Sequence, residues 1–348
     1  MKRFGFLMNR RKALKVAGIS TLTTIGGLGL LRSILVEIGF DLVKETRTKM
    51  GTLVTISLVH KDIDIAKTII EEAFLEIDRL EGLFSSYREG TPLWVLNSEG
   101  VLNNPSPEIL ELLGYAFEID SLTAGAFDVT VAPLSDLYSK TFEEKGKSPS
   151  VLEIENALRL VGSKNIHVEP KQIVFRQEGM SISVDGIAKG YIVDQAAKII
   201  RDAGVRGGLI DAGGDMVALG EDLLGQNWRL AIQHPRNTED YLSVISVRDA
   251  AVATSGDYMQ YLTEDLVLHH IIDPRLGTSP DHTSSVSVVA PTATDADALS
   301  TAALVLGPDK GIKLLNKLSE VEGILVTKDQ QIIKTDGFSQ YEVGVQFS

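Results

Sequence analysis

Asp297 and Thr301 are two oxygen-bearing side chains four residues apart, in a stretch expected to be helical from about Thr294. Residues four apart share one face of a helix, so the carboxylate and the hydroxyl would project together. With backbone carbonyls to complete the shell, such a pair suits a hard cation such as Mg²⁺. Thr294 and Asp297 also fit a capping arrangement, in which the acid would only stabilise the start of the helix. Spacing alone leaves both interpretations open.

A glycine-rich corner lies between residues 181 and 220. The alternating segment 181–185 predicts a strand that enters a helix through Gly186, and a second predicted strand ends at Gly213 and Gly214. Glycines and a helix start bring bare backbone groups to a ligand, and a helix start favours anions such as phosphate. An ordinary β-α-β corner with turn glycines explains the pattern equally well.

His269 and His270 are adjacent and precede Ile271 and Ile272. Adjacent side chains on a strand point to opposite faces, so the two imidazoles cannot readily share one metal ion. One of them could be a general base, and either could equally be a structural histidine.

Tyr87 and Asp128 are two further candidates for binding a ligand. Tyr87 stands on a polar turn, where its ring could stack on a planar ligand or cover the core. Asp128 follows a glycine turn, where a carboxylate can cap the backbone or hold a ligand.

Hydrophobic periodicity predicts the elements that must position these residues. Helices are predicted at 63–84, 107–123 and 151–161, and from Ala188 and Thr294. Strands are predicted at 46–59, 166–176 (a pair turned at Pro170), 181–185, 208–212, 228–233, 242–247 and 286–290, with a charged loop at 140–149. From the residues alone this is an exported α/β protein with a candidate site for Mg²⁺ and phosphate.

Composition bounds the class of protein. The 348-residue chain is 44% hydrophobic and 6% aromatic, as expected of a globular protein with a sizeable core. It has no cysteine, which excludes disulfides, thiolate metal ligands and cysteine nucleophiles. The formal net charge is −13, although the first 36 residues hold seven bases and no acid. A body this acidic argues against nucleic acid as a partner.

The basic N-terminal segment has the pattern of an export signal. Arg10 and Arg11 precede a mildly apolar, uncharged run, 16–31, and then Arg32. This order is typical of a twin-arginine signal, and an exposed basic amphipathic tail is the alternative. Residues 1–36 are therefore predicted to be a twin-arginine-type signal or an N-terminal anchor. The protein would be periplasmic or on the extracytoplasmic face of the membrane, with membrane contact through this segment.

Taken together, eight short segments resemble the ApbE family, the FAD:protein FMN transferases. The resemblance runs from Met50 to about Leu318, and its segments occur in family order. They are M-G-T at Met50, S-S-Y ending at Tyr87, G-A-F-D at Gly125, G-I-A-K-G at Gly186, G-G-D at Gly213, A-T-S-G-D-Y at Ala253, H-I-I-D-P-R at His270 and A-P-T-A-T-D-A-D-A-L-S-T-A at Ala290.

The resemblance implies an α+β fold with mixed sheets flanked by helices, a T-fold-like single compact domain of two lobes at 45–348. It implies transfer of FMN from FAD to a threonine hydroxyl of an exported target flavoprotein, with release of AMP. The implied partner carries the acceptor motif (Asp or Ser)-Gly-(Ala or Ser)-Thr.

The same resemblance implies a role for each matching residue. The Gly186 carbonyl, Asp297 and Thr301 would bind Mg²⁺, and Asp297 would thereby be catalytic. His270 would be the base that deprotonates the acceptor threonine. The residues that would line the FAD site are Met50, Ser86, Tyr87, Arg88, Phe127, Asp128, Lys189 and Ile272.

This chain departs from the family pattern before I-A-K-G. The family has D-L-G-G or a near variant there, whereas this chain has Ser183-Val184-Asp185-Gly186, which displaces the acid by two residues. The displacement changes the expected metal shell, and a second carboxylate nearby could favour attack by water. Two alternative functions therefore remain, an FAD pyrophosphatase that yields FMN and AMP, and a flavin-binding protein without catalysis.

Overall fold

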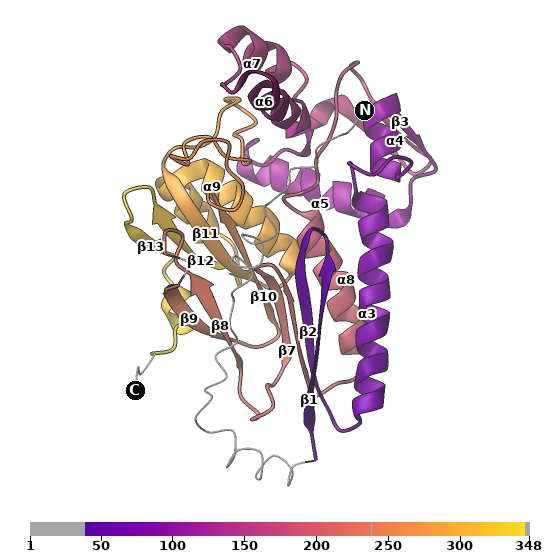
Figure 1. Cartoon of the computed structure of the whole chain (residues 1–348), viewed down its shortest axis with the longest axis vertical. Coiled ribbons are helices and arrows are strands. Elements are labelled where there is room, and N and C mark those ends of the chain that lie inside the picture. The colour runs from indigo at the N-terminus through magenta and orange to yellow at the C-terminus, as the bar shows by residue number, and fades with distance from the viewer. Residues whose placement is uncertain (1–38, 238, 345–348) are drawn as a thin grey trace.

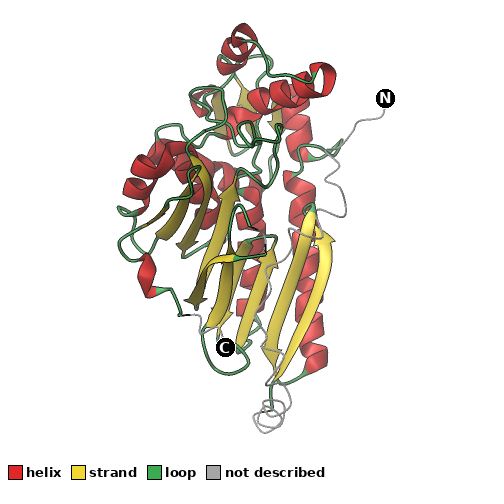
Figure 2. Cartoon of the chain, turned by 60° about the vertical axis from the view of Figure 1, so that its left-hand side comes forward, coloured by secondary structure: helices red, strands yellow, loops and turns green. Residues whose placement is uncertain are grey.

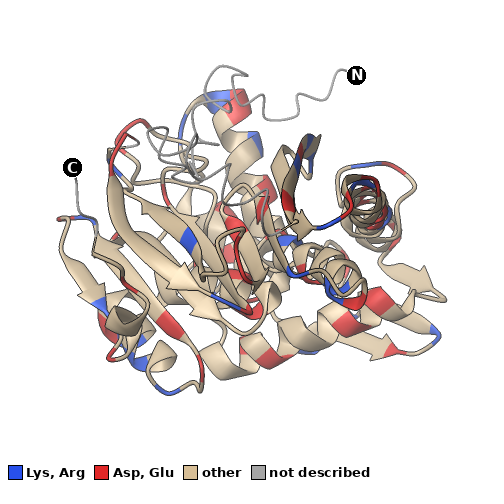
Figure 3. Cartoon of the chain, turned by 90° about the horizontal axis from the view of Figure 1, so that it is seen from below, with Lys and Arg blue, Asp and Glu red and all other residues tan. Residues whose placement is uncertain are grey.

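The computed structural model describes residues 39–237 and 239–344 (Figure 1). The predicted signal or anchor at 1–36 lies outside these residues. Within them, no helix combines the length and the apolar character needed to cross a membrane. Acidic and basic side chains are interspersed over the helices and strands in Figure 3, so charges of both signs are distributed over the fold.

An eight-stranded sheet in which every pair is antiparallel forms the centre of the molecule. Its first hairpin turns through Met50 and Gly51, both with positive φ, as a two-residue hairpin turn requires. In spatial order the strands are β1 (Asp41–Lys49), β2 (Thr52–His60), β6 (Gly207–Ala212), β7 (Asp215–Gly220), β10 (Ala250–Gly256), β11 (Thr283–Ala290), β12 (Glu322–Thr327) and β13 (Ile332–Lys334).

Three long helices cover one face of this sheet (Figures 1 and 2). They are α3 (Ile63–Phe84), α8 (Ala188–Asp202) and α9 (Ala293–Leu315, broken at Gly307 and Pro308). Side chains alternate along a strand, so Val54, Ile56 and Leu58 of β2 enter the core beneath these helices.

A two-stranded sheet covers part of the opposite face. It consists of β8 (Trp228–Gln233) and β9 (Tyr241–Val247). Trp228, Leu230 and Ile232 of β8 form a second core with Leu209 of β6 and Val252 of β10. The main sheet therefore carries a helical layer on one side and a partial β layer on the other.

A smaller group of elements stands at the upper end of the molecule in Figure 1. It is built around a three-stranded sheet, β3-β5-β4. Its elements are α4 (Pro92–Glu99), β3 (Val101–Asn103), α5 (Pro107–Thr123), α6 (Ala132–Lys145), α7 (Val151–Leu158), β4 (Ile166–Glu169) and β5 (Gln172–Phe175).

The α+β class is confirmed, and the predicted helices 63–84 and 107–123 match α3 and α5 in their bounds. The predicted strand at 181–185 is wrong, because that segment is irregular. The side-chain amide of Asn97 accepts from the Ile182 amide and donates to the Ile182 carbonyl, both at 2.8 Å. A side chain thus occupies the backbone groups that a neighbouring strand would use, and no parallel β-α-β unit forms.

Two further expectations are corrected by local chemistry. The predicted strand 46–59 is a hairpin, since Met50 and Gly51 turn the chain. The predicted loop 140–149 is helical to Lys145 in α6, which ends where Gly146 adopts a positive φ. The prediction failed because the end of α6 is rich in exposed charged side chains, a composition that is also typical of loops.

We expect Gly190→Ala to destabilise the protein by ~1–3 kcal/mol through overpacking. A Cβ at Gly190 would lie 2.2 Å from the Ala293 carbonyl oxygen and 2.9 Å from the Asp297 Cβ, so α8 and α9 would have to separate. Urea unfolding measures the effect. The matched control is Gly114→Ala in α5, where the added Cβ meets nothing within 4 Å. A similar stability change in both variants would contradict the close packing.

Candidate functional site

The starts of α8 and α9 meet the turn between β6 and β7, and two buried carboxyls face one lysine at this junction. Asp215 follows the turn and shares its strand face with Val217, which packs under the helices. Its side chain is 1% exposed, and its Oδ2 lies 3.3 Å from Nζ of Lys189 on α8. Asp297 on α9 is 6% exposed, and its Oδ2 accepts the Gly190 amide at 3.0 Å.

Asp297 does not cap its own helix. α9 is capped by Thr292, whose hydroxyl accepts from the Asp295 amide, and by Asp194 of α8. The Asp194 carboxylate accepts the amides of Ala293 and Thr294, each at 2.8 Å. The capping alternative for Asp297 is therefore wrong, and its carboxylate instead accepts an amide in the first turn of α8. Each of the two helices lends a carboxylate to the other.

Thr301 and Gly186 lie side by side next to this cluster. The Thr301 hydroxyl is 2.9 Å from the Ser255 hydroxyl of β10. A Cβ at Gly186 would lie 3.4 Å from Thr301 Oγ1 and 3.2 Å from Cε2 of Phe127. The backbone of Gly186, which has no side chain, therefore lies against the Thr301 hydroxyl. Thr301 itself is one helical turn from Asp297.

Burial and mutual charge shift the pKa values of all three ionisable groups in the cluster. Burial raises the pKa of Asp297 well above its ordinary value, and the adjacent Asp215 carboxyl raises it further. Burial likewise raises the pKa of Asp215, against the pull of Lys189. Burial alone would lower the pKa of Lys189, but the charges of Asp215 and Asp297 outweigh it and raise this pKa. One ammonium therefore faces two carboxyls.

These residues fit a cation that is completed by a ligand. The buried Asp215 Oδ2 accepts no hydrogen bond, so the site has unsatisfied acceptor capacity. Among the described residues, no three His, Cys, Asp or Glu side chains converge on one metal position. One carboxylate, one hydroxyl and one backbone carbonyl (Asp297, Thr301 and Gly186) would leave positions open for oxygens of a bound phosphate, as Mg²⁺ sites commonly do.

The two histidines have different surroundings. His269 is fully buried, its Nε2 lies 3.1 Å from the Pro280 carbonyl oxygen, and burial lowers its pKa to about 4. His270 is exposed, and its Nδ1–H donates to the Gln260 carbonyl at 2.9 Å, which leaves Nε2 as the free acceptor. Desolvation by the surrounding chain nevertheless lowers the His270 pKa, against the effect of the hydrogen bond to Gln260. His269 is thus structural, and His270 is available as a base.

A buried ion cluster anchors the loop that carries His270. Asp257 is fully buried and receives two hydrogen bonds from Arg236, at 2.7 and 2.6 Å. Lys328 bonds to the same carboxylate and also donates to the Leu266 carbonyl at 2.7 Å. The loop is therefore fixed at its start and its middle by residues that follow β8 and β12.

The displaced acid Asp185 is engaged by Tyr87. The Tyr87 hydroxyl donates to Asp185 Oδ2 at 2.7 Å across 98 residues of sequence, and the Tyr87 side chain is 75% exposed. The hydrogen bonds and ion pairs of Asp215 and Asp297 do not include Asp185. This carboxylate joins the aromatic turn to the start of α8.

Other predicted flavin-site residues occupy different surroundings. The carboxylate of Asp128 accepts from the Thr130 amide and hydroxyl and the Ser163 amide, and so caps the short helix Val129–Val131. Ile272 is 5% exposed and packs with Leu134 and Tyr138.

Met50 and Arg88 line a separate hollow of about 390 Å³, in which the Met50 amide donates to Glu81. Ser86 lies in the turn between Phe84 and Tyr87. The roles of these residues in binding flavin stay predictions.

Sequence reasoning missed Asp215 and Asp194 as parts of the site. The alternation of β7 was a usable signal for Asp215, because it places that carboxylate on the face of the apolar Val217. Asp194 carried no local signal, because the amides it binds are about 100 residues away.

The chain matches known proteins over most of its length. The model of the ApbE family matches residues 50–325. The chain is 30% identical to the FAD:protein FMN transferase of Treponema pallidum (strain Nichols) over 77% of this chain and 79% of the relative. It is 29% identical to the enzyme of that name from Escherichia coli (strain K12), over 82% and 84%. The crystal structure of the ApbE protein of Thermotoga maritima superimposes with a TM-score of 0.80 at 30% identity, covering 87% of this chain and all of that one.

We expect Asp297→Asn to stabilise the metal-free protein by ~1–2 kcal/mol at neutral pH. The amide keeps an acceptor for Gly190 and leaves the Asp215 charge paired with Lys189 alone. Because folding raises the Asp297 pKa, the wild type loses stability as pH rises from the ordinary carboxyl pKa towards the raised one, whereas the amide of the variant does not titrate.

The stability gap between variant and wild type should therefore widen with rising pH, which urea unfolding from about pH 5 to about pH 8 measures. The control is Asp295→Asn at the start of α9. A gap that is independent of pH would contradict the charge argument.

Proposed function

Because the chain belongs to the ApbE family, we propose that it is an FAD:protein FMN transferase. The acceptor is a threonine hydroxyl of a target flavoprotein with the motif (Asp or Ser)-Gly-(Ala or Ser)-Thr. The threonine oxygen bonds to the phosphorus of the FMN half as the pyrophosphate bridge breaks, and AMP leaves. The observation that carries this proposal is the buried carboxyl pair Asp215–Asp297 beside Lys189 at the start of α8.

The chain's own residues supply binding and proton transfer. Mg²⁺, held by the Gly186 carbonyl, Asp297 and Thr301, would stabilise charge on the phosphoryl oxygens. The Lys189 ammonium favours the anionic pyrophosphate at this position. His270 Nε2 takes the threonine proton, while the Gln260 carbonyl keeps the imidazole in the required tautomer.

We further propose that the flavin is bound by the predicted residues around this cluster, with Tyr87 offering an exposed ring on its polar turn. Support for export is confined to the sequence, in which Arg10 and Arg11 precede a weakly apolar run. Residues 1–36 then act as a twin-arginine-type signal or anchor, and the enzyme meets its partner on the extracytoplasmic side of the membrane.

The transfer assay is decisive for the function. Purified protein is mixed with FAD and Mg²⁺, with and without a folded acceptor domain that carries the motif. We expect flavin fluorescence on the acceptor band of a denaturing gel and one AMP for each flavin attached. Asp297→Ala should abolish the signal, because it removes the carboxylate of the cation site. FMN released at the same rate without acceptor would instead indicate a pyrophosphatase, and unchanged FAD a binding protein.

His270→Ala should slow transfer by ~10²–10⁴-fold while FAD still binds, because only the proton acceptor is lost. In the wild type the base must be neutral, so the rate should fall as pH drops through the lowered His270 pKa and level off above it. Single-turnover transfer rates across pH check both points, with His167→Ala on β4 as the control. An unchanged rate in His270→Ala would remove its role as the base.

A further inference from the structure

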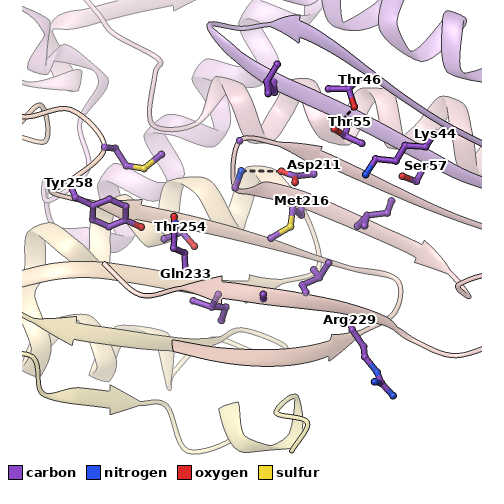
Figure 4. A pocket seen from close by; sticks show the side chains of 18 residues that line it. Lys44, Thr46, Thr55, Ser57, Asp211, Met216, Arg229, Gln233, Thr254 and Tyr258 are labelled. Atoms are coloured by element: carbon purple, nitrogen blue, oxygen red, sulfur yellow. Dashed lines mark hydrogen bonds between the residues drawn. The ribbon is translucent and has the colours of Figure 1, made fainter. Parts of the chain in front are cut away.

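The sheet face opposite the helices changes from apolar to polar along its strands. Val59, Leu209 and Val252 lie beneath β8 and β9. Further along the same strands and on the same face, Thr55 and Thr254 replace them and line a cavity of about 260 Å³ (Figure 4). The covering β layer therefore ends where the sheet surface becomes polar, and a groove remains.

One wall of the groove is an edge strand. Five consecutive residues, 229–233 of β8, line it. Within the described chain β8 pairs only with β9, so its second edge is directed to the groove. An edge strand presents backbone amides and carbonyls that an extended segment can pair with, which is a common way to bind polypeptide.

The groove leads to the candidate site. It is bounded by Gly213 and Gly214, the turn that leads into Asp215 on the helical face, and by Tyr258 and Met259. Met259 precedes Gln260, whose carbonyl orients His270. A segment lying in the groove thus ends beside both the charged cluster and the base.

The exposed charges of the groove are basic. Lys44 of β1 is directed over the polar strip and Arg229 of β8 stands at its rim (Figure 4), and both are exposed. Asp211, the acid in the wall, is occupied by the Gly214 amide. An occupant with acidic side chains complements this surface.

We propose that the groove binds an extended, acidic segment of the acceptor protein, which pairs with the edge of β8 opposite β9 at residues 229–232. The segment delivers its threonine past the Gly213–Gly214 turn to His270. This inference rests on the proposed function, since it names the surface by which the flavin transferase selects its protein substrate.

Charge reversal and filling of the groove test the proposal. In Lys44→Glu and Thr46→Trp we expect KM for the folded acceptor domain to rise by ~10-fold. The kcat, the FAD affinity and FAD cleavage without acceptor should not change. Lys198→Glu, an exposed lysine on α8, is the matched control. If the wild type is active and KM is unchanged in both groove variants, the groove does not bind the acceptor, although the proposed transferase function stands. If the wild type is inactive, the proposed function itself is wrong.

Cross-linking identifies the occupant, because the chain has no cysteine of its own. Thr46→Cys is labelled with a thiol-reactive benzophenone, and Lys198→Cys is labelled in parallel as the control. On illumination with the acceptor domain, we expect acceptor peptides cross-linked at position 46 and none at position 198. Cross-links from position 46 to the chain's own residues 1–38 or to a second copy, or none to the acceptor, overturn the assignment.

Discussion

The carboxyl pair Asp215–Asp297 is the constraint on which the site depends. Two carboxyls are buried beside the half-buried Lys189 ammonium where helices and sheet meet, so ionising both would leave a negative charge without a partner, at considerable cost. Packing alone gives no reason to keep it, since apolar residues of similar volume would stabilise the same junction. A site that binds a cation, as proposed above, would give a reason, because the cation would balance the second carboxylate.

Because side chains alternate along each strand, the two faces of the main sheet carry different sets of polar residues. Asp215 of β7 and Ser255 of β10 point to the helices, where they contact Lys189 and Thr301, whereas Asp211 of β6 and Thr254 of β10 point to the groove. Chemistry and substrate selection can thus use two faces of one rigid sheet, joined at the Gly213–Gly214 turn. Binding of a large partner on one face need not disturb the helices that hold the reacting groups.

Much of this could be predicted from the sequence where the determinants are local. Periodicity gave α3 and α5 their bounds, and the four-residue spacing of Asp297 and Thr301 correctly placed them on one helix. Long-range partners could not be predicted. Asn97 takes the place of a strand partner at Ile182, and Tyr87 binds Asp185 across 98 residues. Neither contact can be recognised from the residues next to it in the sequence.

The reciprocal carboxylates of α8 and α9 explain how Asp297 can serve both fold and chemistry. Asp194 of α8 caps α9, so the start of α9 does not need Asp297. One oxygen of Asp297 accepts the Gly190 amide, which holds the carboxylate in a single orientation at the start of α8. A carboxylate has two oxygens, so the other can bind a cation without breaking this contact. Gly190 matters for the same reason, because a side chain there would separate the two helices and move the Asp297 oxygen that is proposed to bind the cation.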